Sequence, residues 1–229
     1  MCAKGEFEGD TLCPTPRSST STLVDTNYHH TLAWSRSFGR YDVWPELWRI
    51  HRAIGMGGDQ LVPAVAGEAF ERSNGEGARD AWVEEFDRLI DDVRVFDGVE
   101  RLLSELIARG FKVVLASSGK PKHVDHFMDL FNGRDHCDAW TTSEDVESTK
   151  PAPDLMQVAL DKVGGTSGVA IGDSVWDFVA AEKLSLPGIG LRTGGFSAEE
   201  LTAAGAERVY DSLTDLFECL DRTALRRAG

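Results

Sequence analysis

Several features that mark other protein classes are scarce or absent in this sequence of 229 residues. No apolar run approaches the roughly 20 residues that a membrane-spanning helix needs. The first residues lack the charged and then apolar pattern of a secretion signal. The four cysteines stand far apart in the sequence, which fits neither a zinc site nor a disulfide framework. We therefore expect a cytoplasmic protein with ordinary thiols and no membrane partner.

Basic residues are also in short supply. The chain has 24 Lys and Arg against 38 Asp and Glu, which gives a formal net charge of −14. This charge repels polyanions at long range, so we expect no nucleic-acid partner. A small anionic substrate is still compatible with this net charge, where local cations or a metal outweigh the field of the whole protein. The length allows one core domain with a smaller inserted one, and the sequence gives no indication of the oligomeric state.

Short apolar runs alternate with amphipathic stretches from about residue 95 onward. This alternation is typical of parallel strands linked by helices, so we predict an α/β fold with a Rossmann-like parallel sheet. A helix is predicted over Val99–Arg109, where Gly110 ends it. The predicted strands are Phe111–Ser117, Cys137–Thr141, Gly168–Gly172, Pro187–Leu191 and Glu207–Tyr210.

Residues 27–93 have helical periodicity throughout and are predicted to form a separate bundle. Large apolar residues recur there, and we interpret them mainly as core, with a pocket lining as the alternative: Trp34, Trp44, Leu47, Trp48, Ile50, Trp82, Phe86, Leu89 and Ile90. The segment Gly55-Met-Gly-Gly-Asp59 interrupts the helices. It is either a simple connector or a mobile loop over a site.

The first 21 residues differ from the rest of the chain. They contain Pro14, Pro16 and a Ser/Thr run, with almost no apolar stretch. Because central parallel strands are normally continuous apolar runs, we predict no strand in this segment and expect it to be disordered.

Three short motifs follow three of the predicted strands: Ser117-Ser118-Gly119, Lys150-Pro-Ala-Pro-Asp154 and Gly172-Asp-Ser-Val-Trp-Asp177. Each alone has a structural explanation, because serine and aspartate favour helix starts and Lys-Pro favours turns. In open parallel sheets, however, ligands lie beyond the carboxyl ends of the strands. The shared placement of the motifs therefore predicts one functional site.

This series resembles the second, third and fourth motifs of the haloacid dehalogenase (HAD) superfamily, and Thr22-Leu-Val-Asp-Thr26 resembles the end of its first. The branch that it resembles contains phosphoglycolate phosphatase and β-phosphoglucomutase. The resemblance implies a Rossmann-like core, here residues 1–26 and 94–229, and an inserted helical cap at 27–93. It also implies hydrolysis of a small phosphorylated metabolite through an aspartyl-phosphate, with Mg²⁺ as cofactor.

The resemblance also implies a role for each matching residue. Lys150 would place a positive charge beside the phosphate, and Ser117 would donate a hydrogen bond to it, together with the following residues Ser118 and Gly119. Asp173 would bind Mg²⁺. Asp177, one helical turn later, would hold a metal-bound water or orient Lys150.

Two residues of the helical segment are further candidates for contacts with a substrate. His30 follows the hinge sequence Asp25-Thr26 and would assist proton transfer, although a histidine at a hinge is more often structural. Arg52 would read a second anionic group, or it would be a solvated helix residue.

The first motif departs from the family's Asp-x-Asp-Gly-Thr-Leu at its catalytic positions. Alignment on Thr22 and Leu23 puts Ser18 at the nucleophile and Thr20 at the general acid/base. A hydroxyl does not replace a carboxylate that attacks phosphorus and binds Mg²⁺, so we expect little or no turnover. One hypothesis is that the first 21 residues come from a shifted reading frame or a misplaced start. The competing hypothesis is a genuine pseudo-enzyme.

Three functions remain open at this point. A phosphatase is the first choice, because hydrolysis needs fewer additional contacts than phosphoryl transfer between sugars. The alternatives are a catalytically inactive module that binds phosphate or a protein, and a sugar-phosphate mutase. Phosphonate cleavage is disfavoured, because it needs a cap lysine and there is none between Gly5 and Phe111.

Overall fold

The computed structural model describes residues 15–18, 20–145 and 149–226. At its centre is a six-stranded sheet in the order β3-β2-β1-β4-β5-β6, with every neighbouring pair parallel. The predicted α/β class with a parallel sheet is therefore confirmed. The strands are β1 (Thr15–Ser18), β2 (Val114–Leu115), β3 (Ala139–Trp140), β4 (Gly168–Gly172), β5 (Gly188–Leu191) and β6 (Ala206–Tyr210).

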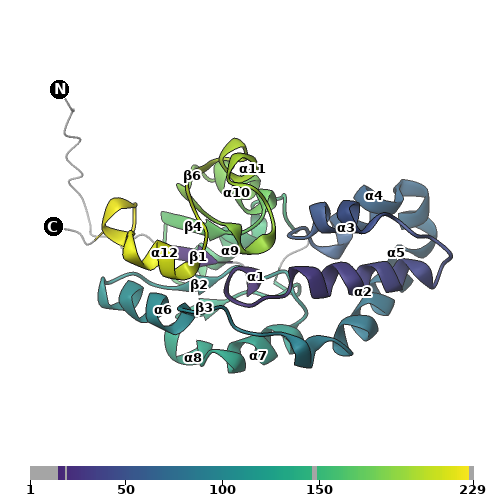
Figure 1. Cartoon of the computed structure of the whole chain (residues 1–229), viewed down its shortest axis with the longest axis horizontal. Coiled ribbons are helices and arrows are strands. Elements are labelled where there is room, and N and C mark those ends of the chain that lie inside the picture. Colours follow the sequence, from purple (N-terminus) through teal and green to yellow (C-terminus); the bar gives the residue numbers. More distant parts are fainter. Residues whose placement is uncertain (1–14, 19, 146–148, 227–229) are drawn as a thin grey trace.

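The helices fall into two groups (Figure 1). Some connect the strands and cover the sheet, and the others form a second group at one end of the molecule. The second group is α2 (Asn27–Gly39), α3 (Leu47–Ala53), α4 (Gly58–Ala66) and α5 (Glu68–Asp87). The others are α1 (Thr20–Leu23), α6 (Val99–Ala108), α7 (Pro121–Leu130), α8 (Gly133–His136), α9 (Asp154–Asp161), α10 (Val175–Glu182), α11 (Ala198–Ala203) and α12 (Leu213–Glu218). Within the described residues, no helix has both the length and the apolar character required to cross a membrane.

The sheet is covered on both faces, and successive residues of a strand enter different clusters. Leu115 and Ile171 pack in the larger cluster, together with side chains of α6, α7 and α12. Val114 and Ala170 pack in a second cluster with side chains of α9 and α10. Because side chains of a strand point alternately to its two sides, an apolar run without polar interruptions is what a sheet covered on both faces requires.

Strand β1 contradicts the prediction that the first 21 residues contain no strand. It lies at the centre of the sheet, where Arg17 is opposite Val114 of β2 and Ala170 of β4. The segment includes Pro16, which has no backbone N–H to donate to the ladder. The position between β2 and β4 offers unpaired backbone groups on both sides, and this tertiary pairing outweighs the poor local propensity. The expected disorder is wrong for residues 15–18, whereas residues 1–14 lie outside the described residues.

The helices α2–α5 pack around a cluster of their own, which includes Trp34, Phe38 and Ile50. The interpretation of the recurring large apolar residues as core is correct for Trp34, Ile50 and Phe86. It is wrong for Trp44 and Trp48, which are 70% and 66% exposed, and for Leu47, which is 50% exposed. The periodicity of the sequence predicted the helices, but it did not show which side chains the neighbouring helices bury.

The two connections between the helical group and the sheet run side by side. Val24 and Val95 form an isolated antiparallel bridge. The backbone N–H of Asp25 donates to Arg94 O at 2.8 Å, and the N–H of Phe96 donates to Leu23 O at 3.1 Å. The helical group is thus attached to the core through two adjacent extended segments, next to the end of β1.

Helix α6 allows a direct test of the core. Leu106 is 1% exposed within the larger cluster, whereas its neighbour Ile107 is 41% exposed. We predict that Leu106→Ala lowers the free energy of unfolding by about 2–5 kcal/mol, because it leaves a cavity. The matched variant Ile107→Ala should change it by less than about 1 kcal/mol. Urea denaturation measures both, and equal losses would contradict the packing of this helix.

Candidate functional site

The predicted motifs meet at the carboxyl edge of the sheet. Ser18, the last residue of β1, pairs in register with Leu115 and with Ile171. Ser117 and Asp173 each come two residues after those partners. The chain crosses from one side of β1 to the other at this point of the strand order, which is where open α/β sheets place their ligands.

Lys150 forms a buried ion pair with Asp177, in which Lys150 Nζ lies 2.6 Å from Asp177 Oδ1. The other carboxylate oxygen, Asp177 Oδ2, accepts hydrogen bonds from the backbone N–H and the hydroxyl of Ser174, at 3.1 and 2.8 Å. These contacts lie in the first turn of α10, so the start of that helix fixes the carboxylate. The side chains of Lys150 and Asp177 are 1% and 2% exposed, so each charge depends on its partner rather than on water.

Asp173 lies fully buried beside this pair and is held by residues from the start of the chain. Its Oδ2 accepts a hydrogen bond from Asn27 Nδ2 at 2.8 Å, and its Oδ1 accepts one from Thr22 Oγ1 at 3.3 Å. Burial raises the pKa of Asp173 to about 6, and the nearby carboxylate of Asp177 adds to the increase, whereas Asn27, Lys150 and Thr22 oppose it. The site therefore carries a buried excess of negative charge.

This arrangement partly fits the Mg²⁺ that the family resemblance implies. Among residues 22–145 and 149–226, no three His, Cys, Asp or Glu side chains form a cluster suited to a metal ion. Mg²⁺ needs only one or two protein carboxylates when a phosphate and waters complete its shell. Asp173 is a carboxylate of this kind, although its two oxygens accept hydrogen bonds from Asn27 and Thr22, and both oxygens of Asp177 contact Lys150 and Ser174. The donor set thus fits an ion that a phosphate helps to hold.

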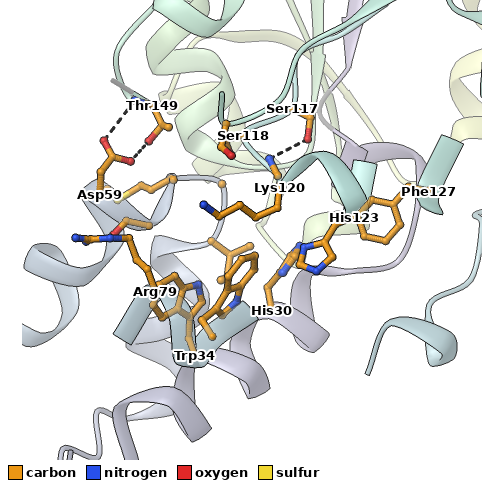
Figure 2. Close-up of a pocket in the computed structure, with 18 residues that line it drawn as sticks. His30, Trp34, Asp59, Arg79, Ser117, Ser118, Lys120, His123, Phe127 and Thr149 are labelled. Carbon is orange, nitrogen blue, oxygen red and sulfur yellow. Dashed lines mark hydrogen bonds between the residues drawn. The ribbon is translucent and has the colours of Figure 1, made fainter. Parts of the chain in front are cut away.

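A pocket of about 250 Å³ lies between the helical group and the sheet edge. Ser117 and Ser118 lie at one end of it and Trp34 and His30 at the other, and the side chain of Lys120 extends between them (Figure 2). Ser117 is buried and its hydroxyl accepts a hydrogen bond from the backbone N–H of Gly119 at 3.1 Å. Gly119, Arg79, Trp82, His123, Phe127 and Thr149 also line the pocket.

The glycine-rich segment 55–59 lies against the core motifs. A Cβ atom on Gly57 would collide with the side chain of Thr149, and one on Gly55 would collide with that of Ser174. Asp59 accepts hydrogen bonds from the hydroxyl of Thr149 and from its backbone N–H, the latter at 3.4 Å. The segment connects α3 to α4 and also lies against the candidate site, and its mobility stays a prediction.

His30 lines the pocket in its uncharged form. Burial lowers the pKa of His30 to about 3, with further contributions from His123 and His29. Its ring stacks on Phe86, with 4.2 Å between the ring centroids. His123 Nε2 lies 2.8 Å from Asp87 Oδ1, and burial lowers the pKa of His123 although Asp87 opposes the shift.

Arg52 lies apart from the pocket. Its guanidinium forms an ion pair with Glu200 at 2.8 Å and lies over the ring of Phe196. The sequence analysis did not identify Asn27, Asp59 or Thr149 as site residues. Sequence signals for two of them existed, because Asp59 ends the glycine segment and Thr149 precedes Lys150. Their partners are distant in the sequence, so only the fold reveals the contacts.

Comparison with known proteins relates this architecture to characterised folds. A hydrolase from Pseudomonas syringae superposes with a TM-score of 0.86 and 29% identity, covering 92% of this chain and 99% of that one. The β-phosphoglucomutase from Clostridium difficile gives 0.79 at 16% identity over 92% of this chain and 96% of its own, a likeness that shows the fold alone.

Among curated proteins, the phosphoglycolate phosphatase of Caulobacter vibrioides is 28% identical over 131 residues, which are 56% of this chain and 55% of that one. The chain spans about half the length of the curated relatives it matches. The model of the haloacid dehalogenase-like hydrolase family matches residues 19–184, well over half of the chain. Fold, motif order and this match agree, and the chain belongs to the haloacid dehalogenase-like hydrolases.

Proposed function

We propose that this chain binds small phosphate monoesters in the arrangement of a Mg²⁺-dependent phosphatase, and that it hydrolyses them at most slowly because residues 18 and 20 are not aspartates. The observation that carries the proposal is the buried Lys150–Asp177 pair beside Asp173, next to a pocket that Ser117 lines. We further propose that the helices α2–α5 are the cap over this site.

The proposed roles follow from the contacts. Lys150 is oriented by Asp177 and provides a fixed positive charge for the phosphate, while Ser117 and the residues after it donate hydrogen bonds. Phosphoryl transfer depends mainly on positioning and on positive charge around the phosphoryl oxygens. When bound, Mg²⁺ would neutralise those oxygens, and Asp173 would hold it. These groups suit phosphate binding whether or not turnover follows.

The first motif limits the chemistry. The position of the family's nucleophile is occupied by Ser18 at the end of β1, and Thr20 begins α1. The match to the family begins at residue 19, so the residues of β1 lie outside it. This boundary supports the hypothesis that the start of the chain is foreign to the family. Reading the other two frames of the coding DNA tests it, and an apolar strand followed by Asp-x-Asp-Gly is the expected result.

Restoring the carboxylates should restore activity. We predict that the double variant Ser18→Asp with Thr20→Asp hydrolyses p-nitrophenyl phosphate in Mg²⁺, and that EDTA abolishes this activity. The native chain should be slower by up to about 10⁶-fold in kcat, which is the order of the loss when a serine protease loses its nucleophile. Release of p-nitrophenol measures both.

A matched double variant, Ser18→Asn with Thr20→Asn, separates charge from size and should remain inactive. Hydrolysis by the native chain at the rate of the Asp variant would refute the role assigned to the carboxylates. A folded Asp variant that binds phosphate but has no activity would refute the proposed catalytic arrangement.

The pKa of Asp173 predicts a pH dependence of stability in the absence of metal. The folded protein retains the proton of Asp173 up to about pH 6, whereas an unfolded aspartate loses it near pH 4. The free energy of unfolding therefore falls as pH rises through this window, by up to about 3 kcal/mol. We predict that Asp173→Asn removes this fall.

Urea denaturation in EDTA at pH 4 and pH 7.5 measures the effect. The free energy of unfolding of Asp173→Asn minus that of the native chain should be more positive at pH 7.5 than at pH 4. The exposed carboxylate of Asp80 provides the control, and Asp80→Asn should shift the two values equally. If this difference changed with pH by the same amount in both variants, the buried charge of Asp173 would not destabilise the folded protein.

A further inference from the structure

Exposed apolar side chains gather on α2, on α3 and on the loop between these helices. Among residues 15–18, 20–145 and 149–226, seven large apolar side chains are exposed, and five of them lie in this part of the chain. The other two are Ile107 on α6 and Leu130 on α7. We call the five the α2–α3 patch: Tyr28, Leu32, Trp44, Leu47 and Trp48.

Two contacts show that the α2–α3 patch is continuous. The ring of Tyr28, at the start of α2, stacks on the ring of His51 near the end of α3, with 5.0 Å between the centroids. At the other end, a Cβ atom on Gly39, the last residue of α2, would collide with the indole ring of Trp44. The segment 44–51 therefore runs antiparallel to α2. Leu32, Leu47 and Trp48 lie between the two contacts.

The area of the α2–α3 patch is large for a monomer. Trp44 is 70% exposed, Trp48 66% and Tyr28 56%. Since a whole Trp or Tyr side chain covers about 150–250 Å², the five side chains together present about 600 Å² to solvent. This value is at the upper end of the largest apolar patches on typical monomers, which are about 300–600 Å² and often functional.

Charged groups around the patch are already paired within the chain. Arg49 lies 3.5 Å from Glu46, and Arg52 lies 2.8 Å from Glu200. Ion pairs of Arg36 and Arg40 with carboxylates of α5 complete the set. A nucleic acid or a strongly charged peptide would therefore find no unpaired arginine among residues 28–52. The patch instead suits a partner surface that is itself apolar and rich in rings.

A second copy of this chain offers such a surface. Two patches covering each other would bury about 1,200 Å² in total, which reaches the lower limit of specific interfaces, about 1,200–2,000 Å². Within the part of the chain that the structure describes, Ile107 and Leu130 are the only other exposed large apolar side chains, and each stands alone on its helix. A copy thus has one surface that complements the patch, and that surface is the patch itself.

We propose that two copies of this chain associate through the α2–α3 patch about a twofold axis. In such a contact the same surface of both copies is used, so the assembly closes at two chains. Tryptophan and tyrosine side chains contribute most to the binding energy of interfaces, and the patch has three of them. The inference does not depend on the proposed function.

Sedimentation equilibrium of the native chain from about 1 to 200 µM tests the proposal. The mass should rise from one chain to two and stop there, with a dissociation constant on the order of 10 µM, at the weak end of specific interfaces. A chain that stays monomeric over this range would overturn the proposal. A mass that continues to rise beyond two chains would overturn the twofold contact.

Salt distinguishes an apolar contact from a charged one. Each copy has a formal net charge of −14, so two copies repel each other and salt screens this repulsion. Dimerisation should therefore strengthen between 50 and 500 mM NaCl. A dimer that weakens over this range would depend on ion pairs, and the proposed contact would be wrong.

A matched pair of variants locates the interface. Leu47→Ser should weaken dimerisation by at least about 10-fold, because the loss of apolar area counts once in each copy. Leu130→Ser, which changes a similarly exposed leucine on α7, should leave it unchanged. Equal effects of the two substitutions would overturn the assignment to α2 and α3.

Trp48→Glu is the second variant, and its side chain is exposed, so the fold does not require it. It places a carboxylate of each copy in the contact and should leave the chain monomeric at about 100 µM, because facing like charges repel. Circular dichroism checks that both patch variants are folded. A folded Trp48→Glu that dimerises like the native chain would overturn the proposal.

Discussion

The buried charges at the carboxyl edge of the sheet constrain everything around them. One ammonium, that of Lys150, lies with the two carboxylates of Asp173 and Asp177, and none of the three residues is more than 2% exposed. Removing such groups from water is costly unless each finds partners. The partners of Asp173 come from a distant part of the chain, because Thr22 and Asn27 contact it, whereas Ser174 at the start of α10 holds Asp177. Satisfying this cluster therefore ties the start of the chain, the loop before α9 and the start of α10 together.

The local sequence pattern was sufficient to predict most strands of the sheet and the place of the motifs after them. The run Gly168–Gly172 forms β4 at the predicted bounds, because an uninterrupted apolar stretch suits a strand covered on both faces. β1 was missed, since the pairing of β2 and β4 on its two sides, rather than its own composition, determines it. The contacts of Asn27 with Asp173 and of Asp59 with Thr149 join residues 146 and 90 positions apart. Local periodicity carries no information about such pairs.

The proposed function assigns recognition and chemistry to different parts of the chain. In the proposed function, a phosphoryl group is held by Lys150, Ser117 and helix starts, which follow β2, β3 and β4 in the chain. The covalent step that the family resemblance implies would need carboxylates at residues 18 and 20, and there the sequence has Ser18 and Thr20. Under that proposal, a change confined to a single short segment removes turnover while the pocket and the buried ion pair remain. The fold retains its architecture because β1 contributes backbone pairing to the sheet.

The hydrogen bonds between Asp59 and Thr149 have a mechanical consequence. Thr149 is bonded to the helical group, while the next residue, Lys150, is bonded to Asp177 in the core. The peptide unit between Thr149 and Lys150 thus joins the helices α2–α5 to the core. It cannot keep both contacts if the helices move away from the core. Displacement of α4 must either break the contact with Thr149 or pull on the lysine. The position of the helices α2–α5 is in this way transmitted through the backbone to the buried ammonium of Lys150.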